Sequence, residues 1–238
     1  SPKQVQLSLN SLGLKEHAGL VIDNIRGRFS KNKNSIVAQE FAIETPQSEF
    51  LLDLAVPMDW CETTKENRVD AKLHLSLQEL ATILGVRDER FDYSKWGPIR
   101  CKISVGGSAQ RMEVEDVYVE LSHSFILSAT GALEHACGEQ RVGQLDLLAD
   151  LYNLSCFNGW LSEDNSIHLP PDMVLRGLLA VDGDKYRGEF TLNDASGLVD
   201  IKANYDSKSE AYLLKGQIDS LQLKHFLPQE PLYNLSLQ

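Results

Sequence analysis

The residues that could carry chemistry in this chain are its histidines, its cysteines and a few serines and carboxylates. The six histidines stand alone in sequence and none has the His-Glu-x-x-His spacing of a zinc hydrolase: His17, His74, His123, His135, His168 and His225. His123 and Ser124 are adjacent in a predicted turn, but a nucleophile needs a base that a third group holds in place, and adjacent hairpin residues seldom provide it. No Gly-x-Ser-x-Gly motif occurs. We therefore expect no enzymatic activity and no catalytic residue.

The four cysteines, Cys61, Cys101, Cys137 and Cys156, include no Cys-x-x-Cys pair. Zinc knuckles depend on such close pairs, so no metal site is predicted from them. Cys101 shares the apolar parity of its strand with Ile99 and Ile103, which predicts burial as a small hydrophobic residue. Sequence alone does not fix the redox compartment, so free thiols and one or two disulfides both stay open.

Two further segments resemble ligand sites only at first sight. The run from Val105 to Ser108 contains two glycines but no following Gly-Lys-Ser/Thr, so it predicts a tight turn and not a phosphate loop. Glu113, Glu115 and Asp116 are close in sequence, but Glu113 and Glu115 lie on the solvent-facing parity of a strand. We expect these carboxylates to be hydrated, and we expect no cofactor.

Composition narrows the class of partner. The chain has 34 acidic and 23 basic residues, a formal net charge of −11, and its basic residues are scattered. Polyanion binding requires clustered Lys and Arg, so nucleic acid is not an expected partner, and neither is a broad face of anionic lipid head groups. With 42% apolar residues the chain can bury a core, and no apolar run is long enough for a membrane-spanning helix.

Period-two alternation runs along almost the whole chain and predicts strands. Clear examples are 69–75, 99–105, 112–114 continuing into 117–121, and 175–181, each with apolar residues at alternating positions. In the first two segments the opposite parity carries charged, histidine or hydroxyl side chains. One dry face and one wet face are typical of antiparallel sheet with a single buried side. Turns are predicted at 30–34, 45–48, 106–108, 182–184, 195–197 and 206–209, and such short intervals favour pairing of neighbouring strands.

One segment has a helical pattern. Within 75–85, Ser76 is a suitable N-cap, Glu79 stands three residues later as in a capping box, and Gly85 can end the helix. A weaker candidate for a helix or turn is 156–161.

A strand, a small polar turn and a second strand recur three times, at 41–54, 117–129 and 190–201. The equivalent positions Phe41, Val119 and Phe190 are separated by 78 and 71 residues. This predicts a repeat architecture, with approximate units 1–75, 76–150 and 151–238 in one continuous fragment. Both ends lie inside strand patterns, so we expect a piece of a longer chain.

The repeated pattern resembles a known family. The residues that carry the resemblance are 18–29, with Gly19, Leu20 and Gly27, and 41–48, with the turn Thr45-Pro-Gln-Ser48. The blocks 175–183, 188–190 and 196–197 are similar to a later repeat of the same kind. This arrangement resembles the TamB and AsmA-like proteins of Gram-negative cell envelopes, especially the long TamB-type proteins of the Bacteroidetes. The third copy has Asp194 in the place of Thr45, and the middle copy lacks the proline.

The resemblance implies a mainly β fold, in which an elongated antiparallel sheet is curled into an apolar groove, the β-taco, with one or two short helices. It implies a non-enzymatic protein of the periplasm that an N-terminal helix anchors in the inner membrane. It also implies phospholipid transport between membranes and outer-membrane protein assembly, with an Omp85-class partner that binds outside this fragment.

Two functional hypotheses follow for the apolar parity, although parity does not say which face is inward. The first is a conduit that shields phospholipid acyl chains. Its candidate groove residues are Leu73, Leu75, Ile99, Ile103, Val119, Leu121, Phe125, Leu127, Leu192, Val199 and Ile201. The second is a chaperone-like scaffold that pairs outer-membrane strands with its sheet edges.

From the alternation alone, a two-sheet sandwich stays an alternative fold, because a second sheet could cover the apolar face. A sandwich could serve as an adhesin or as a carbohydrate-binding module. Such a module would need a surface aromatic platform, for which Trp60, Trp96 and Trp160 are the available tryptophans.

Overall fold

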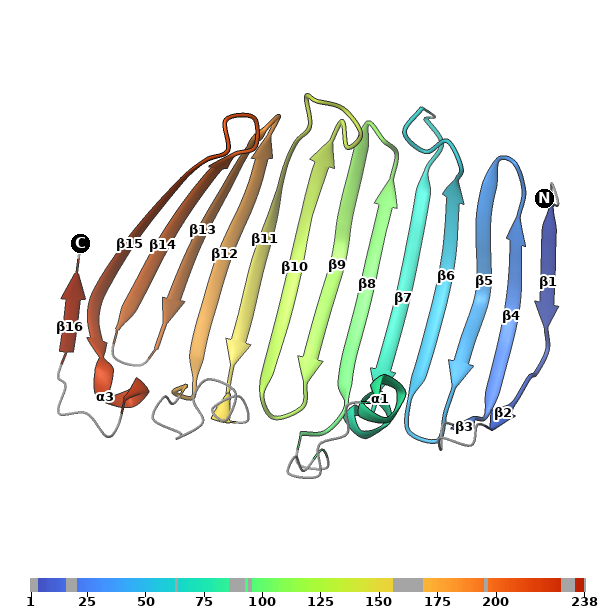
Figure 1. Cartoon of the computed structure of the whole chain (residues 1–238), viewed down its shortest axis with the longest axis horizontal. Coiled ribbons are helices and arrows are strands. Elements are labelled where there is room, and N and C mark those ends of the chain that lie inside the picture. The colour runs from blue at the N-terminus through green and yellow to red at the C-terminus, as the bar shows by residue number, and fades with distance from the viewer. Residues whose placement is uncertain are drawn as a thin grey trace. The chain divides into compact units, whose positions relative to one another are not determined.

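The computed structural model describes residues 4–15, 21–62, 64–85, 93, 96–155, 169–194, 197–227 and 234–237, and strands make up most of it (Figure 1). The strands are β1 (Val5–Leu9), β2 (Leu14–Lys15), β3 (Val21–Ile22), β4 (Asn24–Lys31), β5 (Ser35–Glu44), β6 (Glu49–Pro57), β7 (Asn67–Leu75), β8 (Ile99–Gly107), β9 (Arg111–Leu121), β10 (Phe125–Glu134), β11 (Val142–Leu151), β12 (Met173–Asp182), β13 (Lys185–Asn193), β14 (Leu198–Asp206), β15 (Ala211–Gln222) and β16 (Asn234–Leu237). The helices are α1 (Leu77–Leu84) and α3 (Leu223–Phe226).

The strands form an open sheet in chain order. The hydrogen-bonded order runs from β1 through β4 and then in sequence to β16, while β2 and β3 pair with each other. The pairings within β4 to β9 and within β11 to β16 are antiparallel. The prediction of a mainly β, antiparallel sheet with one or two short helices is therefore confirmed. The weaker helix candidate at 156–161 lies outside the described residues, and none of the described helices is long and apolar enough to cross a membrane.

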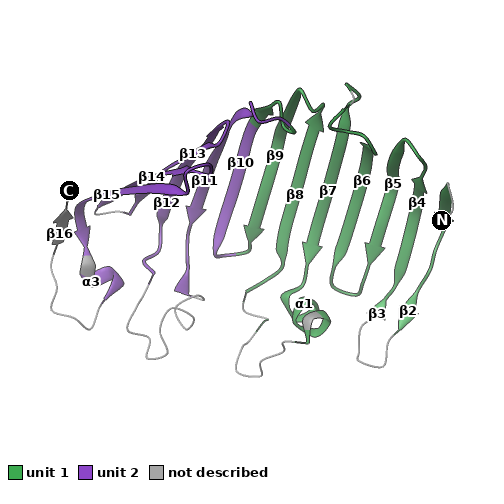
Figure 2. Ribbon diagram, turned by 45° about the horizontal axis from the view of Figure 1, so that its top comes forward, with its two compact units in different colours: residues 1–122, 132–137 green, residues 123–131, 138–238 purple. Residues whose placement is uncertain are grey.

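The chain divides into two compact units, coloured separately in Figure 2. Unit 1 contains residues 1–122 and 132–137, and unit 2 contains residues 123–131 and 138–238. The three approximate repeat units expected from the sequence stay a prediction.

The strand register of unit 1 places the apolar parity of each strand on one common face. Because directly opposite residues in an antiparallel pair point to the same side, one row across six strands can be followed from partner to partner. This row consists of Ile25, Ile43, Phe50, Leu73, Cys101 and Val119. Every member is apolar or a thiol, so the predicted alternation is correct in register as well as in period.

Two β-bulges keep this face continuous. The register of β5 shifts between Ala38 and Phe41, and that of β9 shifts between Val114 and Asp116. At each site an extra polar residue reverses the parity, so that the apolar side chains before and after it still share one side of the sheet. In β5 the bulge residue Glu40 has φ 51°, and its backbone N–H donates to Asp53 Oδ1 at 2.8 Å.

Helix α1 begins and ends as its sequence predicts. Ser76 is the N-cap and accepts from the Glu79 N–H at 3.4 Å, and Gly85 ends the helix with φ 63°. The Glu79 side chain departs from the predicted capping box, because it accepts hydrogen bonds from the hydroxyls of Thr45 and Ser48. The Ser48 hydroxyl in turn accepts the Ser76 N–H at 2.9 Å. The Thr-Pro-x-Ser turn is thus the docking site of the helix N-terminus.

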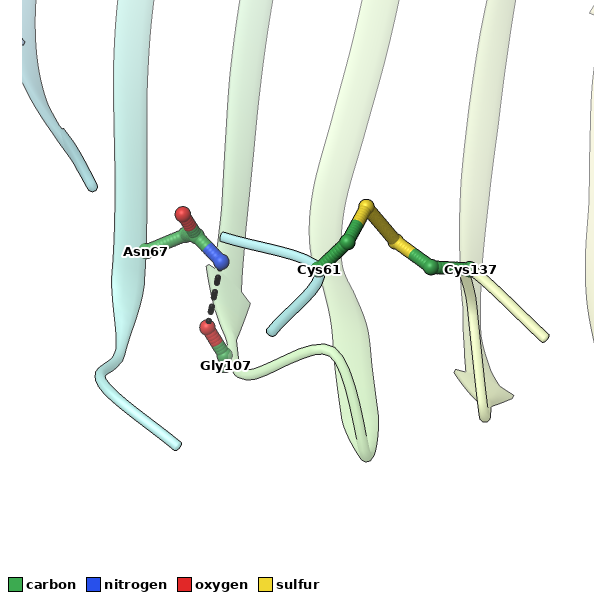
Figure 3. Close-up of a disulfide and its surroundings, with 4 residues drawn as sticks. All are labelled: Cys61, Asn67, Gly107 and Cys137. Carbon is green, nitrogen blue, oxygen red and sulfur yellow. Dashed lines mark hydrogen bonds between the residues drawn. A yellow bond between two sulfur atoms is a disulfide. The ribbon is translucent and has the colours of Figure 1, made fainter. Parts of the chain in front are cut away.

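A disulfide joins two connections in unit 1. Cys61, between β6 and β7, bonds to Cys137, which follows β10, with a Cα–Cα distance of 5.5 Å (Figure 3). Nearby, buried Asn67 donates to the Gly107 carbonyl at 3.2 Å. The Ala136 N–H donates to the carbonyl of buried Ala109 at 2.8 Å, which pins the segment before Cys137 to the β8–β9 turn.

Few large side chains are buried in the described part of the chain. The buried apolar residues include several alanines, and no large side chain there is fully buried. A two-sheet sandwich would bury rows of Leu, Ile and Phe between its layers. The sheet described here instead leaves many large apolar side chains partly exposed, as a single layer does.

Candidate apolar binding face

The predicted groove residues of unit 1 lie together on its apolar face. Leu75, Ile99 and Leu121 are consecutive cross-strand partners, Leu73 and Val119 flank Cys101, and Ile103 lies between Ala71 and Val117. The side chains differ in exposure, since Ile103 is 39% exposed whereas Leu121 is only 4% exposed. Ile103 is therefore part of an open surface, and Leu121 belongs to a packed end of the strands.

The predicted groove residues of β13 and β14 in unit 2 also lie together on one face of the sheet. Leu192 is opposite Val199, and Ile201 is opposite Phe190, so these side chains share one face. Phe125 and Leu127 alternate along β10 and are half-buried. Ile201 is 39% exposed and is thus as open as Ile103 in unit 1.

Phe190 packs unusually close to the backbone of unit 2. A Cβ atom added at Gly177, its cross-strand partner, would come within 2.8 Å of the ring, and one at Gly188 would come within 2.9 Å. The ring occupies the space that side chains at the two glycines would need. Leu179 lies on the same face of β12 as Gly177 and is 39% exposed.

The opposite face of unit 1 is polar and linked by ion pairs. The Arg68 guanidinium contacts Asp70 at 2.6 Å and Glu115 at 2.7 Å. The buried Ser104 hydroxyl lies between the two carboxylates, 2.7 Å from Asp70 and 3.0 Å from Glu115. Lys102 contacts Asp116 at 2.6 Å. The acidic residues expected to be hydrated are therefore paired with cations, and the polar face is held by its own partners.

These contacts shift the pKa of Asp70. The hydrogen bond from Arg68 is the largest cause and that from Ser104 the second, and together they hold the pKa of this carboxyl below its usual range. The pKa of Arg68 is raised, chiefly by the same bond to Asp70. A carboxyl with a lowered pKa stabilises the fold above its unfolded pKa, which is about 4, and this contribution is lost as the pH falls through the folded pKa.

We expect Asp70→Asn to reduce the loss of stability between about pH 5 and pH 3. The effect should be about a few tenths of a kcal/mol, because the pair is half exposed and water screens it. Urea unfolding at a series of pH values measures the slope. High salt should reduce the same slope in the original chain, and an unchanged slope in Asp70→Asn would contradict the assignment.

The other candidate reactive residues do not form a site. His123 is exposed with φ 66°, whereas Ser124 is 6% exposed and buried, so the adjacent pair is split between solvent and interior. Burial raises the pKa of the Cys101 thiol, which is free and half-buried on the apolar face. Among the described residues, no three His, Cys, Asp or Glu side chains are arranged to hold a metal ion.

Unit 1 also has a hollow of about 340 Å³ over β1, β4 and β5. Its lining includes Gln6, Ser8, Arg28, Ser30 and Gln39, together with the apolar residues Leu7, Phe29 and Val37. Arg28 is already paired with Glu40 at 3.2 Å. The hollow therefore has a mixed polar and apolar lining.

Comparison with protein-family models, with curated proteins and with solved structures returns no match for this chain. The case for a function therefore depends on the geometry of the two faces.

One candidate surface was not predicted from the sequence. The tryptophans were the expected aromatic platform, but Trp60 and Trp96 are half-buried and Trp160 lies outside the described residues. Unit 2 instead aligns Tyr186, Tyr205 and Tyr212 as cross-strand partners. The signal in the sequence was a tyrosine close to the predicted turn of each hairpin.

Proposed function

We propose that this chain is a non-enzymatic segment of a TamB or AsmA-like protein whose apolar sheet face shields phospholipid acyl chains. The observation that carries the proposal is the exposure of large apolar side chains that the register places on one face within each unit. Examples are Leu7 at 48% and Ile103 at 39% in unit 1, and Ile201 at 39% and Leu214 at 68% in unit 2. Each square ångström of apolar area that an acyl chain covers contributes about 25 cal/mol.

The character of the opposite face supports the same assignment. In unit 1 it carries Arg68, Asp70, Lys102 and Asp116 in ion pairs, so it is suited to water. When one face of a sheet is hydrated and the other is apolar and uncovered, the hydrophobic effect favours ligand binding only on the apolar face. Contacts with aliphatic side chains are non-directional, which fits a conduit along which lipid slides.

The disulfide supports a location outside the cytoplasm. Disulfides persist in oxidising compartments, of which the periplasm is one. The Cys61–Cys137 bond therefore agrees with a periplasmic segment. Under this proposal, anchoring in the inner membrane and contact with an Omp85-class partner belong to other regions of the full-length protein.

The proposal is tested by photocrosslinking in cells. A photoreactive phenylalanine analogue in place of Ile103 should capture phospholipid, which mass spectrometry of the purified chain would detect. The same analogue in place of Lys102, the adjacent residue on the polar face, is the matched control and should capture little. We expect several-fold more lipid adduct at position 103 than at position 102. Equal capture at the two positions, or none at either, would contradict the proposal.

One observation favours the chaperone-like alternative. Strand β1 is the edge of the described sheet and pairs only with β4, so its other side offers unpaired backbone groups. Its Val5 is 41% exposed and its Leu7 is 48% exposed. A photoreactive residue at Gln6 that captures extended peptides, together with no lipid at position 103, would favour this second function.

A further inference from the structure

Three tyrosines of unit 2 form a row across neighbouring strands. Tyr186 of β13 is opposite Tyr205 of β14, which is opposite Tyr212 of β15. The first two rings have centroids 6.1 Å apart and are tilted by 31°. Exposure increases along the row, from 37% at Tyr186 through 44% at Tyr205 to 85% at Tyr212. No hydroxyl of the three hydrogen-bonds to another described residue.

Arg141 stands beside this row, and its guanidinium forms no ion pair with another described residue. Its guanidinium carbon lies 5.6 Å from the centre of the Tyr186 ring, a cation–π distance. Its Nε donates to the Gly183 carbonyl at 3.2 Å, which fixes the side chain. No carboxylate in the described part of unit 2 forms an ion pair with it. The guanidinium therefore keeps donors for an external anion.

The charged residues of the adjacent hairpins do not compete on this side. Asp182 pairs in register with Lys185, and Lys185 with Asp206, so these three residues share the opposite face of the sheet from the tyrosines. None of the strand residues that the register of β11 to β15 places on the tyrosine side next to the row is charged, and Arg141 is the cation in contact with the row.

The apolar surface begins directly next to the row. One step along the strands, Leu179, Gly188, Ala203 and Leu214 form the next register row. Leu179 is 39% exposed and Leu214 is 68% exposed, with the two small residues between them. The order on this face is therefore cation, then aromatic rings with hydroxyls, then aliphatic side chains.

We propose that Arg141 and the tyrosine row form a subsite for the phosphate-bearing head group of a phospholipid. The acyl chains would lie on the adjacent apolar rows, so this inference rests on the proposed function. The guanidinium donates charge-assisted hydrogen bonds to the phosphate. The tyrosines present an apolar ring and a polar tip at the junction between polar and apolar parts, as they do at membrane interfaces. A sugar would leave Leu179 and Leu214 uncovered, so it matches the surface less well.

The test compares two soluble ligands that differ only in the head group. Dihexanoyl-phosphatidylglycerol, kept monomeric, and dihexanoylglycerol share their acyl chains, and their affinities for the whole chain are measured by calorimetry. We expect the phospholipid to bind about tenfold more tightly, the usual size of a charge-assisted hydrogen bond. Arg141→Gln should remove this preference, and Tyr205→Phe should reduce it. Inorganic phosphate alone should not displace the lipid.

The matched control is Arg176→Gln. Arg176 is exposed, whereas Arg141 is half-buried, and like Arg141 it forms no ion pair with another described residue. Arg176 lies on the other face of the sheet, opposite Leu148 of β11 and Thr191 of β13. The substitution Arg176→Gln removes one positive charge from unit 2, as Arg141→Gln does, and should leave the preference for the phospholipid unchanged. Thermal unfolding of both variants shows whether Arg141→Gln also disturbs the fold, and Arg141→Lys should recover part of the preference.

The outcomes separate the two proposals. Equal affinity for both ligands, or a preference that survives Arg141→Gln, would overturn the head-group subsite and leave acyl-chain binding in place. Loss of the preference in Arg176→Gln to the same degree would also overturn it. Competition by inorganic phosphate would show an anion site unrelated to lipid. Binding of neither ligand would overturn the proposed function and the subsite with it.

Discussion

Reduction of the Cys61–Cys137 disulfide is expected to lower the free energy of unfolding of unit 1 by about 3 to 4.5 kcal/mol. The bond joins residues 76 apart in sequence. Closing so long a loop lowers the conformational entropy of the unfolded chain. The unfolded state therefore becomes less favourable relative to the folded state. The folded contacts around it, such as Ala136 to Ala109, hold the two connections in place and are expected to remain until the sheet unfolds.

Guanidinium unfolding with and without reductant measures this effect, and the paired variant Cys61→Ser with Cys137→Ser should reproduce the reduced value without reductant. Cys101→Ser is the matched control, because Cys101 is a free thiol in the same unit. It should leave the response to reductant intact. Unfolding midpoints that do not respond to reductant in the original chain would contradict the pairing.

The second large effect is expected at Gly27. Its φ is 131°, and an added Cβ atom would lie 2.5 Å from Phe41 Cα and 2.9 Å from the Glu40 carbonyl oxygen. Both neighbours are backbone atoms of the β5 bulge, so the strain is not relieved by turning a side chain. Gly27→Ala should therefore lower the stability by about 3 kcal/mol or more, through the unfavourable dihedral angle and the forced separation of β4 and β5.

Gly216→Ala is the control for this prediction. A Cβ atom at Gly216 of β15 meets only the Asp200 carbonyl oxygen, at 4.0 Å, and its φ is not in the left-handed region. The substitution should change stability by less than about 1 kcal/mol in either direction. Urea unfolding of the three proteins gives both values. If the Gly27→Ala protein were as stable as the original, β4 and β5 would not approach as closely at Gly27 as described.

The Gly27 geometry also gives a physical meaning to the pattern that resembles TamB-type repeats. Gly27 allows the close crossing at the β5 bulge, and the Thr45-Pro-Gln-Ser48 turn receives the N-terminus of α1 through Glu79. Both are structural devices of a strand and turn repeat. They hold β4, β5, β6 and α1 of unit 1 together.

Alternation was the strongest information in the sequence. It predicted the shared parity of Leu73, Leu75, Ile99, Ile103 and Val119, which the register confirms. The bulges were not predicted, although apolar parity does switch at the adjacent polar residues Gln39 and Glu40. Shared parity is a local feature, because successive side chains of a strand point to opposite faces of the sheet. It can therefore be read from a few neighbouring residues.

Contacts between residues far apart in sequence could not be predicted from the alternation. The four cysteines allow several pairings, and only the fold brings Cys61 to Cys137. Glu79 was expected to complete a capping box, but the turn at Thr45 provides better donors once β5 and β6 are placed beside the helix. The outcome in each case depends on loop closure and on competition between hydrogen-bond partners, neither of which a local pattern contains.

The sequence by itself determined the strands, the turns, the first helix and the division into a wet and a dry parity. Tertiary structure alone decided that the dry face stays open in the described residues, with Ile103 and Ile201 exposed. It also decided that Arg141 stands beside Tyr186 and forms no ion pair with a carboxylate in the part of the chain that the structure describes. The physical reason is the distance along the chain over which each feature is determined. Alternation reflects the two-residue repeat of a strand, whereas coverage of a face and pairing of a charge depend on segments brought together by folding.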